Sequence, residues 1–350
     1  MRRRGRAKTD YSKDIALVGS ARQWIAWTIL LFLLLVLPQV LRETANLTWL
    51  SFLNFTLITI IAVLGLNVIT GMSGQISLGH AAFIMVGGYC VAIFTVQAGW
   101  SFWPALLVGV LITGIIGVLV AIPAIRLKGF YVAVVTLAFF FVAQYAIRKL
   151  PIAGGIHGLI GVPSPAIGGL KLNSDVEWYY LLFVFTTMSV LASANLTRSR
   201  FGRAFLALRD NSTATASLGI DVPVSKMRAF FIGSLYAGLA GGLLTGYLSV
   251  VRTDQFTIWD SIWYVGMVII GGAGSTAGAV MGVIFLRLIS QVLHVIGTSG
   301  LVPLGSNTSA ALSYALFGLV IILFISFQPH GLIAVWHKIR VNYKRWPFGV

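Results

Sequence analysis

Runs of predominantly apolar residues, each about 20 residues long, recur along this chain. A helix needs about that length to cross the hydrocarbon core of a bilayer. Of the 350 residues, 58% are hydrophobic and 10% are charged, whereas a soluble domain carries about 25% charged residues. The pattern therefore predicts an all-α, polytopic membrane protein and excludes a soluble one.

We expect about ten spans, with both termini in the cytoplasm. A short eighth segment leaves a nine-span or re-entrant arrangement open. Residues 1–23 form a basic cytoplasmic tail, 24–327 the membrane domain with an external loop at 148–177 and a cytoplasmic loop at 197–228, and 328–350 a second basic tail. The expected spans cover about 24–40, 49–69, 78–96, 102–125, 130–147, 178–195, 229–250, 261–270, 278–296 and 310–327.

The distribution of basic residues supports this orientation, because Lys and Arg accumulate in short cytoplasmic loops. Of the 25 Lys and Arg residues, all but six fall in the regions assigned to the inside. Arg287 lies within a span, and the five on the outside are Arg42, Arg148, Lys149, Lys171 and Arg252. The net charge of +16 is thus explained by topology, and we expect no nucleic-acid partner.

Two polar, glycine-rich stretches interrupt the apolar sequence. The first, residues 66–83, contains Ser73, Gln75, Ser77 and His80. Irregular backbone survives within a membrane only where protein surrounds it or where it lines a wet cavity, so this stretch is a candidate substrate pathway. The second, residues 271–278, adds Gly271, Gly272 and Ser275 as candidates. A tight cytoplasmic turn at the first stretch and small-residue helix packing at both remain open alternatives.

Several absences limit the chemistry. The chain has no Gly-Lys-Ser or Gly-Lys-Thr sequence, and hence no Walker A loop for nucleotide phosphates. The nine acidic residues fall in loops or at span edges, whereas ion-coupled carriers usually bury carboxylates. No catalytic set or metal-ligand spacing appears, and the single cysteine, Cys90, lies in an apolar run. We therefore expect neither an enzyme nor a bound metal or cofactor, and energy must come from elsewhere.

The cytoplasmic segment Arg200–Asn211 predicts a short amphipathic helix. Phe201, Phe205 and Leu208 recur at helical spacing, and Gly219 marks a later stop. Such a helix either lies on anionic lipid through its arginines or docks into a groove of a partner protein.

These motifs resemble those of the M-type (LivM-like) permeases of branched-chain amino-acid ABC importers, over roughly Ala62–Phe327. The matching stretches are Gly71–Phe83, Arg200–Asn211 with Leu218-Gly219-Ile220, and Ile270–Ser275 with Gly278. His157 stands where the family often has an acidic residue. The resemblance implies an ATPase-coupling loop formed by Phe201, Gly202, Arg203, Phe205, Leu208, Arg209, Asp210 and Asn211.

The resemblance also implies a heteromeric importer in the inner (plasma) membrane of the cell. Its other parts would be cytoplasmic ABC ATPase subunits, a second permease subunit or a copy of this chain, and a periplasmic or lipid-anchored solute-binding protein. Branched-chain (Leu/Ile/Val) or similar small amino acids are the expected substrates. The alternatives are an importer of urea or short amides, a self-contained secondary carrier or channel, and a non-transporting membrane scaffold.

Four further residues carry individual expectations. His80 is expected to donate a hydrogen bond from a neutral imidazole to a neighbouring carbonyl. Asn54 and Asn67 are expected to hydrogen-bond between helices. Arg287, deep within a span, is expected to form an internal or interface pair or, alternatively, to contact a substrate carboxylate.

Overall fold

The computed structural model describes residues 34–42, 47–127, 129–167, 170–298, 315, 318–324, 326–328 and 331–345. The principal helices are α3 (Leu47–Leu66), α4 (His80–Ala92), α5 (Phe102–Ile125), α6 (Phe130–Lys149), α7 (Asp175–Arg198), α8 (Arg200–Asp210), α9 (Ser212–Ser217), α10 (Val222–Leu248), α11 (Ile258–Gly271), α12 (Thr276–Thr298) and α14 (Gly331–Arg345). The short segments are the π-helices η1 (Asn67–Met72) and η2 (Ile93–Gln97), the 3₁₀ turns η3 (Pro151–Ala153) and η4 (Thr253–Gln255), and the strands β1 (Leu159–Ile160), β2 (Ala166–Ile167), β3 (Leu170–Lys171) and β4 (Val250–Val251).

The predicted class, a helical multi-pass membrane protein, is confirmed. Six described helices are long and apolar enough to cross a membrane, and the pair α11 and α12, bent by 119° at its break, can supply a seventh span. The helix α11 has only 14 residues, or about 21 Å of rise, which is too short to cross a full bilayer. The predicted count of ten stays a prediction, and the spans expected near 24–40 and 310–327 are described only in part.

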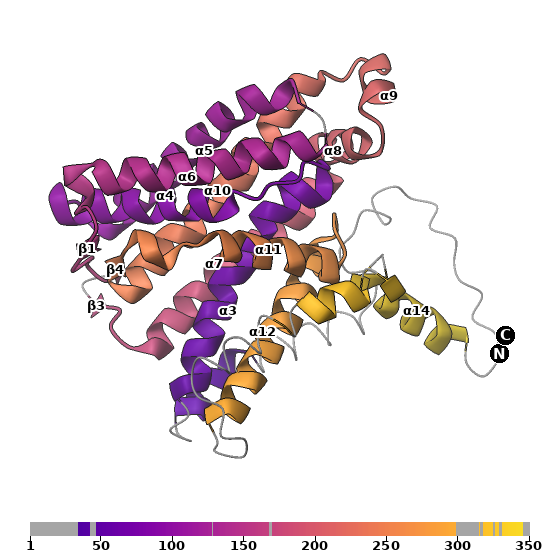
Figure 1. Cartoon of the computed structure of the whole chain (residues 1–350). Helices are drawn as coiled ribbons and strands as arrows, with labels where there is room; N and C mark the ends of the chain where they lie inside the picture. Colours follow the sequence, from indigo (N-terminus) through magenta and orange to yellow (C-terminus); the bar gives the residue numbers. More distant parts are fainter. Residues whose placement is uncertain are drawn as a thin grey trace.

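The helices form two groups. In Figure 1, α4, α5, α6 and α10 run roughly side by side across the upper half, while α3, α7 and α12 run obliquely below them and α11 lies between. The central helix is α10, which packs against α3, α4 and α5. Glycines allow this close packing: a Cβ on Gly87 of α4 would lie 2.4 Å from Cα of Gly238 on α10. Small residues at such crossings are typical of membrane helices, because they let backbones approach.

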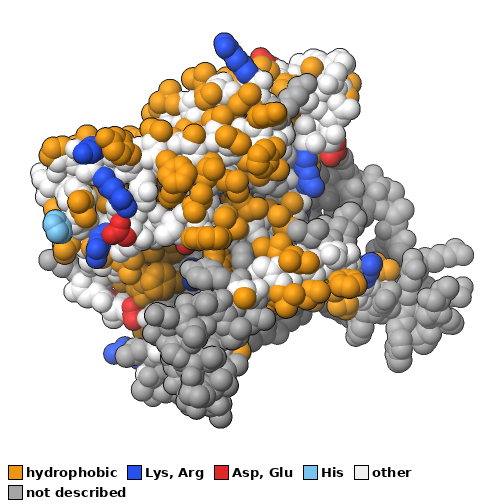
Figure 2. Space-filling view, in the orientation of Figure 1, with side chains coloured by type: hydrophobic (Ala, Val, Ile, Leu, Met, Phe, Trp, Pro, Cys, Tyr) orange, Lys and Arg blue, Asp and Glu red, His pale blue; other side chains and the backbone are white. Residues whose placement is uncertain are grey.

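An apolar belt separates two polar ends. Figure 2 shows hydrophobic side chains over α5 and α6, with charged side chains gathered at the left, near the strands, and at the right, near α8 and α9. We call these the outer end and the inner end, following the predicted orientation. Exposed members of the belt include Leu107, Ile115, Leu119, Phe141 and Val142. Such a face is suited to lipid or to a second membrane subunit.

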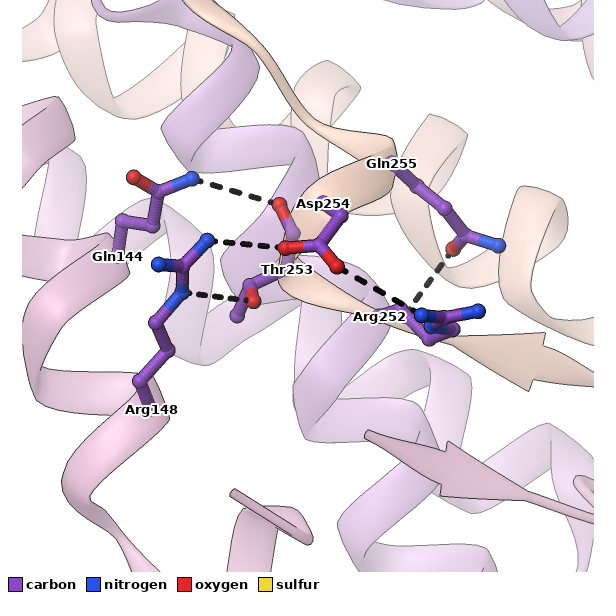
Figure 3. A network of polar contacts seen from close by, with 6 residues as sticks. All are labelled: Gln144, Arg148, Arg252, Thr253, Asp254 and Gln255. Atoms are coloured by element: carbon purple, nitrogen blue, oxygen red, sulfur yellow. Dashed lines mark hydrogen bonds and ion pairs between the residues drawn. The ribbon is translucent and has the colours of Figure 1, made fainter. Parts of the chain in front are cut away.

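The outer end is held together by short strands and by a polar network. The strand β1 pairs with β4 in antiparallel register, Leu159 opposite Val251. Beside this pair, Arg148 of α6 donates from Nη2 to Asp254 Oδ1 at 2.9 Å and from Nε to Thr253 Oγ1 at 3.0 Å, as Figure 3 shows. These bonds fix η4, and hence the start of α11, to α6.

Of the two asparagines expected to bond between helices, Asn54 does so, and Asn67 bonds instead to the segment between α11 and α12. Asn54 Nδ2 of α3 donates to the carbonyl oxygen of Asp175, the first residue of α7, at 3.0 Å. Asn67 Oδ1 accepts from the backbone N–H of Gly274 at 2.9 Å.

The region expected as a basic C-terminal tail contains α14, which packs against α11 and α12, with Gly331 against Gly272.

Candidate functional site

The first break is closed by its own polar side chains. After η1, Ser73 Oγ donates to the carbonyl of Ile69 at 2.6 Å, and Gln75 Nε2 donates to Ser73 Oγ at 3.3 Å. Thr70 Oγ1 donates to the carbonyl of Gln75 at 3.1 Å and accepts from the N–H of Ser77 at 3.3 Å. Ser73, Gln75 and Ser77 are all buried. Of these predicted pathway residues, only Ser73 therefore satisfies a backbone carbonyl through its side chain, and Gln75 Oε1 and the Ser77 hydroxyl have no hydrogen-bond partner among the described residues.

The break runs back into the helix bundle. His80, the first residue of α4, is fully buried and donates from Nε2 to the carbonyl of Ala62 at 2.8 Å. Ala62 precedes Met72, the end of η1, by about three helical turns. The N–H of Leu78 donates to Thr136 Oγ1, within α6, at 3.0 Å. Thus α4 starts beside the last turns of α3, and most of the irregular segment is buried, with Gly74 and Ile76 exposed.

The hydrogen bond of His80 confirms the expected donation to a carbonyl. The other ring nitrogen, Nδ1, is buried and has no partner in the described part of the chain. The ring also makes edge-on contacts with Phe83 and Tyr264, at centroid separations of 6.4 and 6.2 Å. His80 therefore joins α4 to both α3 and α11.

The start of α4 is capped by a residue from a distant segment. Gly79 at the N-cap position offers no side chain, although helix N-termini normally need an acceptor for their free N–H groups. Ser261 of α11, fully buried, accepts from the N–H of Ala81 through Oγ at 3.0 Å. The N–H of Ala82 donates to the carbonyl of Gly79 at 3.0 Å. The beginning of α11 therefore stabilises the beginning of α4.

The second break requires its glycines. Gly272 and Gly274 have φ of 115° and 86°, conformations that other residues rarely adopt. A Cβ on Gly271 would lie 2.0 Å from the carbonyl oxygen of Gly278. Ser275 Oγ accepts from the N–H of Gly278 at 3.1 Å, so this predicted pathway residue caps the first turn of α12. The three predicted residues of the second break thus shape the bend between α11 and α12.

The two breaks meet, and one arginine joins them. The bond between Asn67 and Gly274 connects η1 directly to the second break. Arg209 of α8 donates from Nη1 to the carbonyl of Gly71 at 2.7 Å and to the carbonyl of Ala273 at 3.0 Å. A Cβ on Gly74 would lie 3.1 Å from Cα of Arg209. We call this group of residues, Asn67, Gly71, Gly74, Arg209, Ala273 and Gly274, the junction.

The helix α8 rests on the junction through its apolar face. Phe205 is fully buried in a cluster with Val68, Met72 and Ala229, and Leu208 is also buried. Ser199 Oγ accepts from the N–H of Gly202 at 3.2 Å and so caps α8. Asn211 Oδ1 accepts from the N–H groups of the first turn of α9. The apolar residues of the predicted coupling loop therefore face this chain itself.

The outward face of α8 is mixed. Arg203, Leu206 and Asp210 are exposed there, and Leu218, just after α9, is 77% exposed. Phe201 is partly buried, with the guanidinium groups of Arg200 and Arg228 over its ring at 5.0 and 5.1 Å. This face offers charges and isolated leucines to a partner at the inner end of the molecule.

The arrangement links α8 to both breaks. Arg209 donates to one carbonyl in each break, and the breaks lead into the starts of α4 and α12. Sequence reasoning found both breaks and the arginine, but it missed Ser261 and Thr136, which complete them. Each lies in an apolar helix far along the chain from its partner, and no local pattern marks such residues.

Comparisons with known proteins agree with this picture. The family described as "Branched-chain amino acid transport system / permease component" matches residues 48–325. The high-affinity branched-chain amino acid transport system permease protein LivM of Salmonella typhimurium is 28% identical over 304 residues, covering 80% of this chain and 68% of that protein. The probable LivM permease of Methanocaldococcus jannaschii is 27% identical over 224 residues, covering 63% and 64%.

A relative with a different solute in its name also matches. The autoinducer 2 import system permease protein LsrC of Salmonella choleraesuis is 28% identical over 225 residues, covering 59% of this chain and 60% of that protein. No solved structure matches the chain.

Proposed function

Because this chain belongs to the family of permease components of branched-chain amino acid transport systems, we propose that it is the membrane subunit of an ABC importer for branched-chain or similar small amino acids. The LivM relatives support this substrate class. The match to the Salmonella typhimurium protein covers 80% of this chain. The importer would lie in the inner (plasma) membrane and take its solute from a periplasmic or lipid-anchored binding protein.

Separate ATPase subunits would supply the energy. The sequence has no Walker A loop. The carboxylates in the described part of the chain lie at helix ends or in loops. Glu177, Asp221 and Asp260 cap the first turns of their helices, and Asp175, at the start of α7, accepts from Ser51 of α3 and Tyr247 of α10. An ion-coupled carrier would need a carboxylate inside the bundle. The chain would therefore form a passage that opens only when a partner moves it.

The observation that carries the proposal is the double hydrogen bond of Arg209. The ATPase subunits would bind the outward face of α8, α9 and Leu218. When they close, α8 would shift, and Arg209 would carry the shift to Gly71 and Ala273 at once. A guanidinium suits this role, because its planar, always charged fork can hold two acceptors in fixed geometry. A second permease subunit, or a copy of this chain, would complete the passage.

The test is uptake of leucine by proteoliposomes that contain the complete importer and its loaded binding protein. We expect Arg209→Ala to lower uptake at least tenfold while the ATPase subunits still copurify, because the apolar anchor of α8 at Phe205 is intact. Arg126→Ala is the matched control, since Arg126 is an exposed cation at the inner end and contacts neither break. Uptake by Arg209→Ala at the wild-type rate would refute the coupling role.

Two further measurements address the class of protein and the solute. Vesicles containing this chain alone should not accumulate leucine, and concentrative uptake there would indicate a secondary carrier. The similarity to LsrC, named for autoinducer 2 import, makes a different small solute the second candidate. Ligand binding by a solute-binding protein encoded beside this chain would separate the candidates. Binding of leucine, isoleucine or valine supports the first, binding of autoinducer 2 supports the second, and binding of urea or short amides would favour the alternative expected from sequence.

A further inference from the structure

A cavity of about 240 Å³ lies among α3, α4, α10, α11 and α12. Most of its wall is apolar, and one cation projects into it from α12. The cavity is smaller than the roughly 300–1,000 Å³ of sites for drug-sized ligands, so it suits a molecule of amino-acid size. The lining residues that matter here are Phe55, Ile58, Thr59, Leu244, Tyr264 and Arg287.

The cavity extends from the middle of the bundle toward the outer end. Thr59 and Ala62 line its deep part, and both lie near the middle of the continuous helix formed by α3 and η1. Gln255 and Leu248 line the other side. Gln255 is exposed beside the network of Figure 3, where its Oε1 accepts from the N–H of Arg252 at 3.1 Å. A solute arriving from the outside would therefore meet this cavity before the breaks.

Arg287 has unused hydrogen-bonding capacity there. Its Nη2 donates to Thr59 Oγ1, while its Nε is buried without a hydrogen-bond partner among the described residues. Within the same residues, no carboxylate forms an ion pair with it. The carboxylate of Asp260, one turn before Tyr264, accepts from the N–H and Oγ1 of Thr257 through Oδ2 at 2.7 and 2.8 Å, so it caps the start of α11.

A charged guanidinium in this position destabilises the protein unless an anion or several hydrogen-bond acceptors compensate its charge. Charged residues within membrane spans face a bundle interior or a wet cavity and mark substrate or ion pathways. Arginine remains protonated and pairs with carboxylates side-on through two parallel N–H groups. Arg287 lines the cavity. A carboxylate there would pair side-on with the buried, unpartnered Nε and with the second N–H of Nη2, whose other N–H donates to Thr59 Oγ1.

We propose that Arg287 binds the carboxylate of the transported solute, with the aliphatic side chain against Phe55, Ile58 and Leu244. This inference rests on the proposed function and names the site that receives the amino acid within the membrane. Tyr264, which also lines the cavity, contacts the ring of His80. An occupied cavity is therefore adjacent to the start of α4, the helix that the first break positions.

The test measures binding directly, with purified importer complex in nanodiscs, without the binding protein. Leucine, isovalerate (the carboxylate without the amine) and leucinamide (the amine without the carboxylate) are titrated by calorimetry. We expect leucine and isovalerate to bind and leucinamide to bind at least tenfold more weakly. Arg287→Gln should raise the Kd for leucine and isovalerate at least tenfold. Equal affinity for leucine and leucinamide, or an unchanged Kd in the variant, would overturn the proposal.

Control variants separate this role from a structural one. Thr59→Val keeps the charge but removes the hydroxyl that orients it, and it should weaken leucine binding by a smaller factor even if Arg287→Gln does not fold. Ser290→Ala is the matched control on α12, because the Ser290 hydroxyl bonds, among the residues that the structure describes, to the carbonyl of Leu286 in its own helix. An unchanged Kd in Thr59→Val would count against the proposal, as would an equal loss in Ser290→Ala.

The outcomes also distinguish this inference from the proposed function. Receptor-driven uptake of leucine by wild type, with an unaltered KM in Arg287→Gln, would leave the importer intact and remove the carboxylate site. Conversely, binding of isovalerate that depends on Arg287, in a complex that imports no amino acid, would retain the carboxylate site and refute the importer of amino acids.

Discussion

The substitution Gly71→Ala provides a quantitative test of the contact between the two breaks. A Cβ at this position would lie 2.1 Å from Asn67 Oδ1 and 2.5 Å from the backbone nitrogen of Gly274. The asparagine oxygen cannot swing away freely, since it accepts from that same N–H at 2.9 Å. The added methyl group must therefore push η1 and the second break apart.

The magnitude follows from three contributions. Overpacking a tight site costs about 1–3 kcal/mol, and loss of the Asn67 hydrogen bond costs roughly a further 1 kcal/mol. Alanine also restricts the unfolded chain, which stabilises the folded protein by about 0.4–1 kcal/mol. The expected loss of stability is about 1–3.6 kcal/mol. The carbonyl of Gly71 also accepts from Arg209 at 2.7 Å, so uptake should fall together with stability.

The assay combines thermal unfolding of the purified protein with leucine uptake by the reconstituted importer. Gly318→Ala is the control, because a Cβ there would meet no atom of the described residues within 4 Å and should not lower Tm. We expect Gly71→Ala to lower both Tm and uptake relative to this control. If Tm and uptake match the control, the breaks are not in the contact described, and the argument for the junction fails.

Two further predictions concern the helix start at α4 and the orientation of the chain. Ser261→Ala leaves the N–H of Ala81 without its acceptor at 3.0 Å, which should destabilise the protein by about 1–3 kcal/mol. A measurement of Tm checks this, and an unchanged Tm would contradict it. The orientation is tested with Arg345→Cys in a chain whose single cysteine, Cys90, is replaced by Ala. The new thiol should react with an impermeant reagent only after the cells are permeabilised, because basic tails remain inside. Labelling in intact cells would reverse the orientation.

The sequence predicted helix ends best where residues next to the end determine it. The span expected at 102–125 matches α5, Phe102–Ile125, at both ends. Here Gly99 and Ser101 precede the apolar run and a basic residue, Arg126, follows it, so the change in polarity marks the ends. The prediction was less precise for α10, which begins at Val222 rather than near 229. Asp221 caps its first turn by accepting from the N–H of Val224 at 3.0 Å, so the helix continues into polar sequence beyond the membrane.

Contacts between distant segments were beyond sequence reasoning. An amphipathic pattern in α8 shows that one face is apolar, but not whether lipid, a partner or the same chain covers it. The structure places Phe205 against Val68 and Met72, so the same chain covers that face. Likewise, the glycines and serines of the first break were compatible with a surface turn. Only the bond between His80 and Ala62 shows that the helix restarts inside the bundle.

The helix α11 connects the features that the sequence left separate. Its first turns supply Ser261 to the start of α4 and Tyr264 to the cavity that Arg287 lines. Its last residue, Gly271, leads directly to Ala273, whose carbonyl Arg209 holds at 3.0 Å. A helix of 14 residues is about 21 Å long. We expect so short a helix to move as one rigid unit. A shift of α8 at the inner end should therefore displace Ser261 and Tyr264 together, changing the cavity and the start of α4 in one step.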